Sequence, residues 1–549
     1  MTSPIARNSY YKPLNWWLPG TVAIMGLLLL IGLPLAALLG SVNELHFGTL
    51  LQNSYIRNVV SFSLWQASLS TLLAVGLSIP VAFSLARQAD FFGRQLLIRL
   101  FSMSLIIPTV VGVFGIIAIF GNNGWLKQWL AASGIQGNFS IYGLTGILIA
   151  HVFFNLPLSA RIILNALEKI PAENWRLASQ LGITSFNSLR LIQWPVIRST
   201  LPGIALLVFS LCFTSFAIVM TLGGGPGATT IEVAIYQALR FEFNLDNAVG
   251  LALIQMGLCL ALILFSARFG KAPVISQSRG RLYRRRDGET LGARLFDFMM
   301  IGLVAVLVCL PITAIFQAGL NTKLVNVLQD NSFWQAATNT LLVSLLAGSL
   351  AVLLACGLLI TSVHLRTRLG LHFSGRLVEL SGSFILVIPP LALGTGLFLL
   401  LRDFADVFAL ALVLTVLINA LMGLPFAIRV LENPMLDAAL SNDRLCSALG
   451  IEGLNRLRIV EWPLLRKPFG LALAFSSTLA AGDLTVIALF GSQDVRTLPL
   501  LLYQNMGSYR LQEAAVIALL LLLFCLLLFW LLEILVGGNR APELTHVDA

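Results

Sequence analysis

Charged residues are scarce in this chain. Only 11% of its 549 residues are Asp, Glu, Lys or Arg, whereas 57% are hydrophobic. A soluble globular domain carries roughly 25% charged residues. The shortage excludes a protein whose surface faces mainly water, and it indicates a chain that is embedded in a membrane.

Motifs for catalysis are missing as well. The chain has six cysteines, none of them in a C-x-x-C pair, and only five histidines. It also lacks G-x-S-x-G, H-E-x-x-H and the phosphate loop G-x-x-x-x-G-K-[ST]. We therefore expect no disulfide framework, no metal site, no cofactor and no catalytic residue, and we expect that the chain does not hydrolyse ATP itself.

Long apolar runs are abundant instead. About 20 apolar residues cross a bilayer as a helix, which satisfies its own backbone hydrogen bonds in lipid. Twelve runs qualify, six in a first set (16–40, 57–86, 97–120, 140–164, 200–222 and 248–267) and six in a second (296–317, 339–361, 377–401, 407–428, 470–490 and 513–536). We predict an all-α polytopic membrane protein with about twelve transmembrane helices.

A constant register relates the two sets. Five residues of the first set recur 268 residues later in the second: Pro157, Gly182, Trp194, Pro195 and Arg198 as Pro425, Gly450, Trp462, Pro463 and Arg466. Two tandem units of this kind predict pseudosymmetric halves around a central pathway. We expect a first half at 1–267, a basic cytoplasmic linker at 268–295 and a second half at 296–549.

Lysine and arginine are distributed unevenly between the loops. With the N-terminus placed in the cytoplasm, 28 of the 35 fall on the cytoplasmic side and seven on the other. Such an excess is typical of cytoplasmic loops. The asymmetry predicts that both termini are cytoplasmic, and it explains the net charge of +10 without nucleic acid as a partner. The arginine-rich linker is a topology anchor or a contact for anionic membrane lipid.

Two polar loops follow the fourth and the tenth span. Each reads as a short amphipathic helix, a glycine, a second basic helix and a Trp-Pro pair that enters the next span. Glycine suits the end of a helix and proline the start of one. An aliphatic residue ten positions and a proline thirteen positions after the glycine occur in both loops: Gly182, Ile192 and Pro195, then Gly450, Val460 and Pro463.

This pattern resembles the cytoplasmic loop of ATP-binding-cassette importer permeases, E-A-A-x3-G-x9-I-x-L-P. The chain departs from it with Arg176 and Arg444 at the Glu position, Cys446 at the second Ala of the later copy, and Trp in place of Leu. In that family the loop forms a coupling helix that sits in a groove of the ATPase subunit. The resemblance implies two copies of a separate ATP-binding subunit as partners, and ATPase-coupling loops made of Arg176, Leu177, Ala178, Gly182, Ile192, Pro195, Arg444, Leu445, Cys446, Gly450, Val460 and Pro463.

Further segments narrow the resemblance. They read HVFFNLP at 151–157, LGGGPGATTIE at 222–232, VLENP at 430–434 and RTLPLLLYQ at 496–504. With them, nearly the whole chain is similar to the fused permeases of bacterial thiamine importers. The resemblance implies a multi-pass protein of the bacterial cell inner membrane that imports thiamine and its phosphate esters, with a periplasmic substrate-binding protein as a partner.

Two alternatives stay open. Permeases for iron(III) and other small solutes share this architecture, and nothing in composition or spacing separates their substrates. An ion-driven secondary transporter also favours twelve helices in two halves, but it would leave the paired loops without a role.

Polar side chains within the spans are candidates for the transport pathway, because they are costly in hydrocarbon. Asp483 stands out, since a carboxylate suits a cationic thiazolium; packing against a neighbouring helix is the other interpretation. His151 and Asn155 lie one helical turn apart on one face, and a packing role is favoured for them. Asn419 and Gln255 also qualify.

The glycine-rich segment 223–227 falls on the non-cytoplasmic side. It is interpreted as a flexible turn or as part of a docking surface or gate for the binding protein.

Overall fold

A computed structural model describes residues 17–41, 52–88, 90–104, 106–134, 140–269, 290–451 and 453–538. Most of the predicted linker, at 270–289, and both chain ends lie outside these ranges. The described elements are all helical, which confirms the all-α prediction.

The first set of helices covers residues 17–269. Its elements are α1 (Trp17–Leu27), η1 (Leu28–Gly32), α2 (Leu33–Gly40), α4 (Ser54–Arg87), α5 (Arg94–Met103), α6 (Thr109–Phe120), α7 (Trp125–Ala132), α8 (Leu144–Leu167), α9 (Ala172–Gln180), α10 (Ser185–Ser188), η3 (Leu189–Gln193), α11 (Trp194–Phe213), α12 (Ala217–Leu222), η4 (Pro226–Ala228), α13 (Ile231–Arg240) and α14 (Leu245–Phe269).

The second set covers residues 291–537. Its elements are α15 (Leu291–Gly319), α16 (Leu324–Gln329), α17 (Asn331–Thr367), α18 (His372–Ser383), η6 (Phe384–Val387), α19 (Pro390–Leu401), α20 (Ala411–Ala448), α21 (Gly453–Arg456), η7 (Leu457–Glu461), α22 (Trp462–Gly482), α23 (Thr485–Phe490), α24 (Leu498–Gly507) and α25 (Leu511–Gly537).

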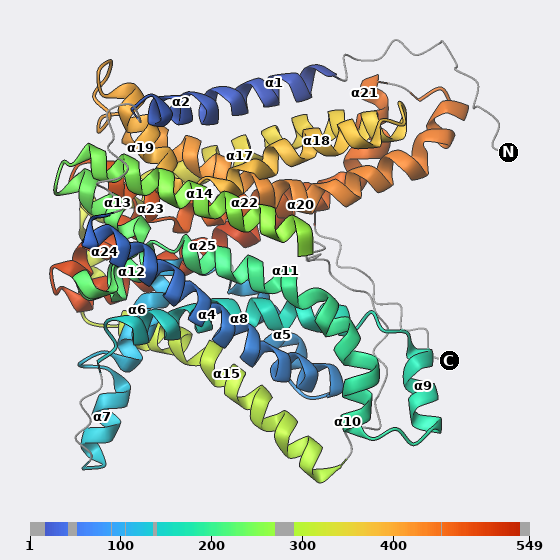
Figure 1. Cartoon of the computed structure of the whole chain (residues 1–549), viewed down its shortest axis with the longest axis horizontal. Coiled ribbons are helices and arrows are strands. Elements are labelled where there is room, and N and C mark those ends of the chain that lie inside the picture. The colour runs from blue at the N-terminus through green and yellow to red at the C-terminus, as the bar shows by residue number, and fades with distance from the viewer. Residues whose placement is uncertain are drawn as a thin grey trace.

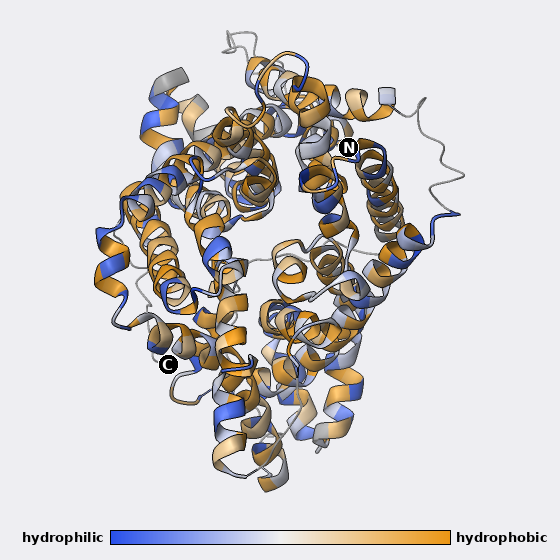
Figure 2. Cartoon of the chain, turned by 90° about the vertical axis from the view of Figure 1, so that its left-hand side faces the viewer, coloured by the Kyte–Doolittle hydropathy of each residue, from blue (hydrophilic) through white to orange (hydrophobic). Residues whose placement is uncertain are grey.

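The number of spans agrees with the prediction. Within the described ranges, eleven helices are long and apolar enough to cross a membrane, or twelve if one bent pair counts as a span. Apolar ribbon predominates when the bundle is viewed from one end (Figure 2). The chain therefore folds as a multi-span helical membrane protein.

Four predicted spans are interrupted. In 200–222, α11 ends at Phe213 and α12 begins at Ala217, and in 470–490, α22 ends at Gly482 and α23 begins at Thr485. The prediction of one helix over 97–120 is wrong, because α5 ends at Met103 and α6 begins at Thr109. The predicted span 377–401 bends by 88° between η6 and α19. Pro108 and Pro389 stand at the breaks in 97–120 and 377–401. Proline lacks a backbone N–H and moves the residue before it out of the helical region, so the third predicted span of each set is interrupted.

The first helix of each set packs on the other set (Figure 1). α1 and α2 lie along α17 and α19, whereas α15 lies along α4 and α6 as well as along α25 of its own set. On α1, the N–H of Gly20 donates to Thr361 Oγ1 at 3.1 Å. On α15, Asp297 pairs with Arg87 of α4 inside the protein. The two sets are interlocked by these exchanged helices.

The bundle has two distinct ends. In Figure 1 the end that carries α9, α10 and α21 lies on the right and is called the loop end. The other end, with α7, α13 and α24, is called the opposite end. Apart from the exchanged first helices, the sets contact each other toward the opposite end, where α13 packs on α19 and α23, and α6 packs on α24 and α25. Toward the loop end the ribbons of the two sets diverge.

Candidate functional site

The two polar loops turn on glycine in the same way. Gly182 and Gly450 both have φ of 63°, the left-handed conformation that ends many helices. In each loop the next residue closes the turn: Ile183 N donates to Ala178 O at 3.0 Å, and Ile451 N donates to Cys446 O at 2.9 Å. A Cβ at either glycine would meet no atom within 4 Å. The backbone conformation alone therefore calls for glycine here.

The chain then runs without a break into the next span. The segments 189–193 and 457–461 form π turns, in which Trp194 N donates to Leu189 O and Trp462 N to Leu457 O. Pro195 and Pro463 follow and have no N–H to donate. The basic helix predicted after each glycine thus continues through a π turn into α11 or α22.

The two loops differ before the glycine. The prediction of a short separate helix holds for α9 but is wrong for the second loop, where α20 continues from the span to Ala448. Pro171 stands between α8 (Leu144–Leu167) and the start of α9, whereas Ala439 stands 268 residues later. The helix α20 itself contains Pro425 and Pro434 and continues past both.

The candidate coupling residues divide into a buried and an exposed face. Ala178 and Cys446 are buried at equivalent positions, and Leu177 is exposed. Ile192 and Val460 are half-buried, and Arg176, Pro195 and Pro463 are exposed. The side chains of Arg444 and Leu445 lie outside the described part of the structure.

The sequence interpretation missed two leucines in these loops. Leu181 and Leu449 directly precede the glycines, and they are 69% and 63% exposed at the tip of the turn. Their signal is an apolar residue at the same position in both polar loops. Exposed apolar side chains at a loop tip offer a contact for another protein.

His151 and Asn155 join helices of the first set to one another. Ser70 Oγ and His151 Nδ1 are 2.8 Å apart, and Asn155 Nδ2 donates to Cys212 Sγ at 3.4 Å. Gln66 Nε2 donates to Cys212 O at 3.0 Å. These contacts connect α4, α8 and α11, as expected of residues that fix packing.

Asp483 lies at the break between α22 and α23. Its carboxylate accepts hydrogen bonds from Thr485 N at 3.1 Å and Val486 N at 3.2 Å and so caps α23. Asn419 of α20 is a neighbour of this carboxyl group. The structure therefore brings Asp483 and Asn419 together and places His151 and Asn155 among helices of the other set.

A second buried carboxylate belongs to the first set. Glu232 opens α13 and is fully buried, and its Oε1 accepts from Gln255 Nε2 at 2.9 Å. Among the residues that the structure describes, none forms a hydrogen bond with the buried Oε2 of Glu232. The helix α13, which carries Glu232, packs on α23, which Asp483 caps.

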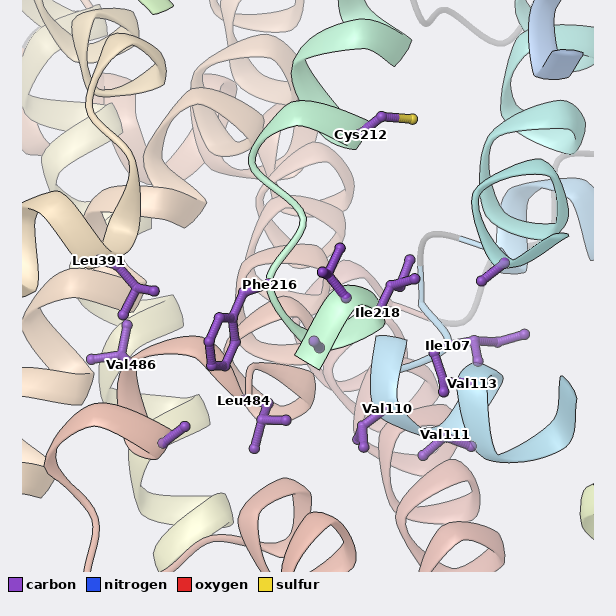
Figure 3. Packing of buried hydrophobic residues seen from close by; sticks show 14 of the residues in the cluster. Ile107, Val110, Val111, Val113, Cys212, Phe216, Ile218, Leu391, Leu484 and Val486 are labelled. Atoms are coloured by element: carbon purple, nitrogen blue, oxygen red, sulfur yellow. The ribbon is translucent and has the colours of Figure 1, made fainter. Parts of the chain in front are cut away.

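An apolar layer joins the two sets near these carboxylates (Figure 3). The first set contributes α6 and α12, and the second contributes α19, the end of α22 and α23. The residues drawn include Val110, Val111, Phe216, Ile218, Leu391, Leu484 and Val486. Gly482 lies directly on Pro108 of the first set, because a Cβ there would come within 3.0 Å of Pro108 Cβ. The layer lies toward the opposite end of the bundle.

The sequence of the chain is similar to the sequences of known transport proteins. Residues 78–271 match the family described as "Binding-protein-dependent transport system inner membrane component". The chain is 45% identical over 528 residues to the "Thiamine transport system permease protein ThiP" of Escherichia coli (strain K12), covering 96% of this chain and 97% of the relative. Proteins with the same description from Brucella abortus (strain 2308) and Haemophilus influenzae are 41% identical over 532 residues and 37% identical over 516 residues. These alignments cover 97% and 93% of this chain, and 97% and 94% of the relatives.

The chain belongs to the binding-protein-dependent transport permeases. The permease is thus a multi-span transporter subunit of the inner membrane and not an enzyme. Membership in this family implies a substrate-binding protein and an ATPase as partners.

The glycine-rich turn of the permease lies at its opposite end. Gly224 and Gly225 have φ of 72° and 139°, and the short η4 follows. The turn borders a cavity of about 500 Å³, whose lining includes Tyr55, Gln237 and Glu242.

Proposed function

We propose that this permease imports thiamine and its phosphate esters from the periplasm to the cytoplasm, powered by two copies of a separate ATP-binding subunit. The observation that carries the proposal is the 45% identity over 96% of the chain to a protein described as a thiamine transport permease. A periplasmic substrate-binding protein delivers the substrate. The permease itself forms and breaks no covalent bond.

In this proposal the loop end faces the cytoplasm, and both termini lie there. The excess of lysine and arginine in the predicted cytoplasmic loops supports this orientation. The permease consists of a first half (1–267), a basic linker (268–295) and a second half (296–549). The support is the recurrence of Gly182 and Gly450 with the same φ, 268 residues apart.

The two polar loops serve as coupling helices. Each places an apolar side chain, Leu181 or Leu449, where a groove of one ATPase subunit can receive it. Ala178 and Cys446 are buried, so their side chains pack the two loops against the rest of the permease. ATP-driven closure of the two subunits would then draw the loops together.

Closure at the loop end opens the opposite end. Apart from the exchanged first helices, the halves pack on each other at the opposite end and diverge toward the loops, which is an inward-facing arrangement. When the loops approach one another, the apolar layer around Phe216 and Leu484 must separate. Because ATP binding in the partner favours the outward-facing state, the equilibrium between the two states shifts toward it.

The candidate pathway runs past Asp483 and Asn419. The carboxylate stands at the junction of the two halves, next to the contact of Gly482 with Pro108. A negative charge there suits the thiazolium cation of thiamine. His151 and Asn155 support the helices that surround the path.

Uptake of labelled thiamine tests the proposal. Cells that lack this chain should lose uptake at nanomolar thiamine, and restoration of the chain should return it. A defect in iron(III) uptake with normal thiamine uptake would overturn the substrate and leave the transport mechanism in place. Uptake into vesicles that continues without ATP would instead favour an ion-driven transporter.

A further inference from the structure

Two turns at the opposite end of the permease have an unusual backbone. Phe243, between α13 and α14, has φ of 52°, and Tyr509, between α24 and α25, has φ of 59°. Within the described ranges no other residue except glycine has a positive φ. A bulky residue in this conformation is a genuine outlier, because its Cβ approaches the following carbonyl oxygen. The loop end uses glycine for its left-handed turns, at Gly182 and Gly450.

The two turns are equivalent in the two halves and are closed by the backbone. Asn244 N donates to Ala238 O at 2.9 Å, and Arg510 N donates to Asn505 O at 3.0 Å. The side chains of Phe243 and Tyr509 are nevertheless 78% and 89% exposed. The strain therefore holds two aromatic rings outward without burying them. Strain of this kind persists where a functional contact needs it.

The charges beside the two rings are of opposite sign. Glu242 and Asp246 are exposed next to Phe243, whereas Arg510 is exposed next to Tyr509. Glu242 also lines the cavity of about 500 Å³ by the glycine-rich turn. The two halves thus present the same aromatic anchor in different electrostatic surroundings.

We propose that Phe243 and Tyr509 are the anchor residues on which the soluble substrate-binding protein docks, one on each half. Exposed aromatic side chains are typical anchors of protein interfaces, and a ring that the backbone already holds outward loses little entropy on binding. This inference rests on the proposed function, which places the opposite end in the periplasm.

The charges also define the partner's orientation. Glu242 and its cavity accept a basic side chain of the binding protein, and Arg510 accepts an acidic one. Electrostatic complementarity of this kind fixes the register of a complex and speeds encounter. The pseudosymmetric permease can therefore be docked in only one of two orientations. The lipid headgroup layer is a poorer partner for Phe243, because the carboxylates of Glu242 and Asp246 repel anionic lipid.

Glycine substitutions test the two anchors. In the permease–ATPase complex in nanodiscs, Phe243→Gly and Tyr509→Gly remove the rings and suit the positive φ, so both variants should fold at least as well as the wild type. We expect the half-saturating concentration of binding protein for ATPase stimulation to rise about tenfold in each and about a hundredfold in the double variant. ATPase activity without binding protein should not change.

The control is Trp129→Ala, which removes another exposed aromatic ring from α7 at the same end. It should leave the half-saturating concentration as it is. Glu242→Lys and Arg510→Glu should each raise that concentration, and by less at high salt. An unchanged half-saturating concentration in the double glycine variant would overturn the inference.

Photo-crosslinking in intact cells identifies the partner. A benzophenone side chain at position 243 or 509 should capture a solute-binding protein, through peptides from different lobes. Capture of a binding protein for a solute other than thiamine would refute the proposed function and retain the docking site. Capture of phospholipid alone, as expected for the control position Trp65 on α4, or of no product, would refute the docking site.

Discussion

At the scale of single residues, a buried charge pair holds α15 on the first half. Arg87 Nε donates to Asp297 Oδ2 at 2.7 Å, and its Nη2 donates to Oδ1. Gln88 Nε2 adds a third bond to Asp297 at 2.8 Å, and the ring of Phe83 lies 4.5 Å below the guanidinium carbon. A buried charge that loses its partner costs more than the pair contributes. The pair therefore fixes where the exchanged helix docks.

Removing one member of this pair should destabilise the permease strongly. Arg87→Met leaves Asp297 buried without its countercharge, and we expect a loss of roughly 3–5 kcal/mol. The double variant Arg87→Met, Asp297→Leu should recover most of it. Thermal unfolding of the purified protein in detergent measures both effects. Arg402→Gln, which breaks an exposed pair with Asp403, is the matched control and should change stability by less than about 1 kcal/mol. A wild-type melting temperature for Arg87→Met would contradict this account.

At the scale of elements, α13 and α24 begin in the same way. Ile231 N donates to Ser63 Oγ at 2.9 Å, and Leu498 N donates to Thr340 Oγ1 at 2.8 Å. Both hydroxyls are buried on the long helix of their half, α4 or α17. A helix start needs partners for its free N–H groups, and here another helix supplies one.

Loss of either hydroxyl should loosen the helix that it anchors. Ser63→Ala and Thr340→Ala each leave a buried N–H without a partner, at a cost of about 1–3 kcal/mol. Hydrogen exchange should become faster at Ile231 or Leu498, in the half that carries the change. Ser63→Thr and Thr340→Ser each keep a hydroxyl group at the position. These variants should protect the N–H groups of Ile231 and Leu498 from hydrogen exchange nearly as well as the wild type. Equal protection in the alanine variants would show that the bond contributes nothing.

The glycine turns of the coupling loops can be disrupted directly by proline substitutions. Gly182→Pro with Gly450→Pro is incompatible with φ of 63°, because proline fixes φ near −65°. We expect the loops to lose their turn, so that ATPase binding and transport fall while the spans remain folded. Gly134→Pro, at a left-handed turn of the opposite end, controls for proline itself. Normal transport by the double variant would refute the assignment of these loops to coupling.

Some features of these elements could be predicted from the sequence and others could not. Apolar length located the spans, and the repeated spacing from Gly182 located both loops. Hydropathy did not detect the break at Pro108, although the proline itself was a visible signal. The first half has Pro171 between α8 and α9, but α20 continues past Pro425 and Pro434, so the positions of the prolines did not predict which of the two loops has a separate helix. Hydropathy patterns predict which residues lie in a helix but not which helices pack together. The hydrogen-bond partners of Asp483 and His151 could therefore not be predicted from the sequence.

At the scale of the whole molecule, the exchange of first helices was also beyond the sequence. α1 and α15 are apolar runs like the others, and nothing in their composition names the half that they contact. The exchange means that neither half can move as an isolated bundle. Relative motion of the halves therefore carries α1 with the second half and α15 with the first, around the apolar layer at the opposite end.

The contact between the halves in the apolar layer can be weakened by adding a single methyl group at Gly482. A Cβ at Gly482 would lie 3.0 Å from Pro108 Cβ and 3.1 Å from its Cα, so Gly482→Ala should wedge the halves apart in the inward-facing state. If the strain is about 1.4 kcal/mol, the outward-open population rises tenfold. With the six native cysteines replaced by alanine, a membrane-impermeant thiol reagent added outside should then label Leu484→Cys about tenfold faster.

A control must show that faster labelling of Gly482→Ala reflects opening of the apolar layer and not a general loss of stability. Gly76→Ala on α4, where a Cβ meets nothing within 4 Å, should leave the labelling rate unchanged. The wedge should also raise ATPase activity in the absence of binding protein, because the closed layer is what the ATPase normally works against. If Gly482→Ala lowered stability but altered neither labelling nor ATPase activity, the contact with Pro108 would be ordinary packing, and the closure of the opposite end would have to be sought elsewhere in the layer.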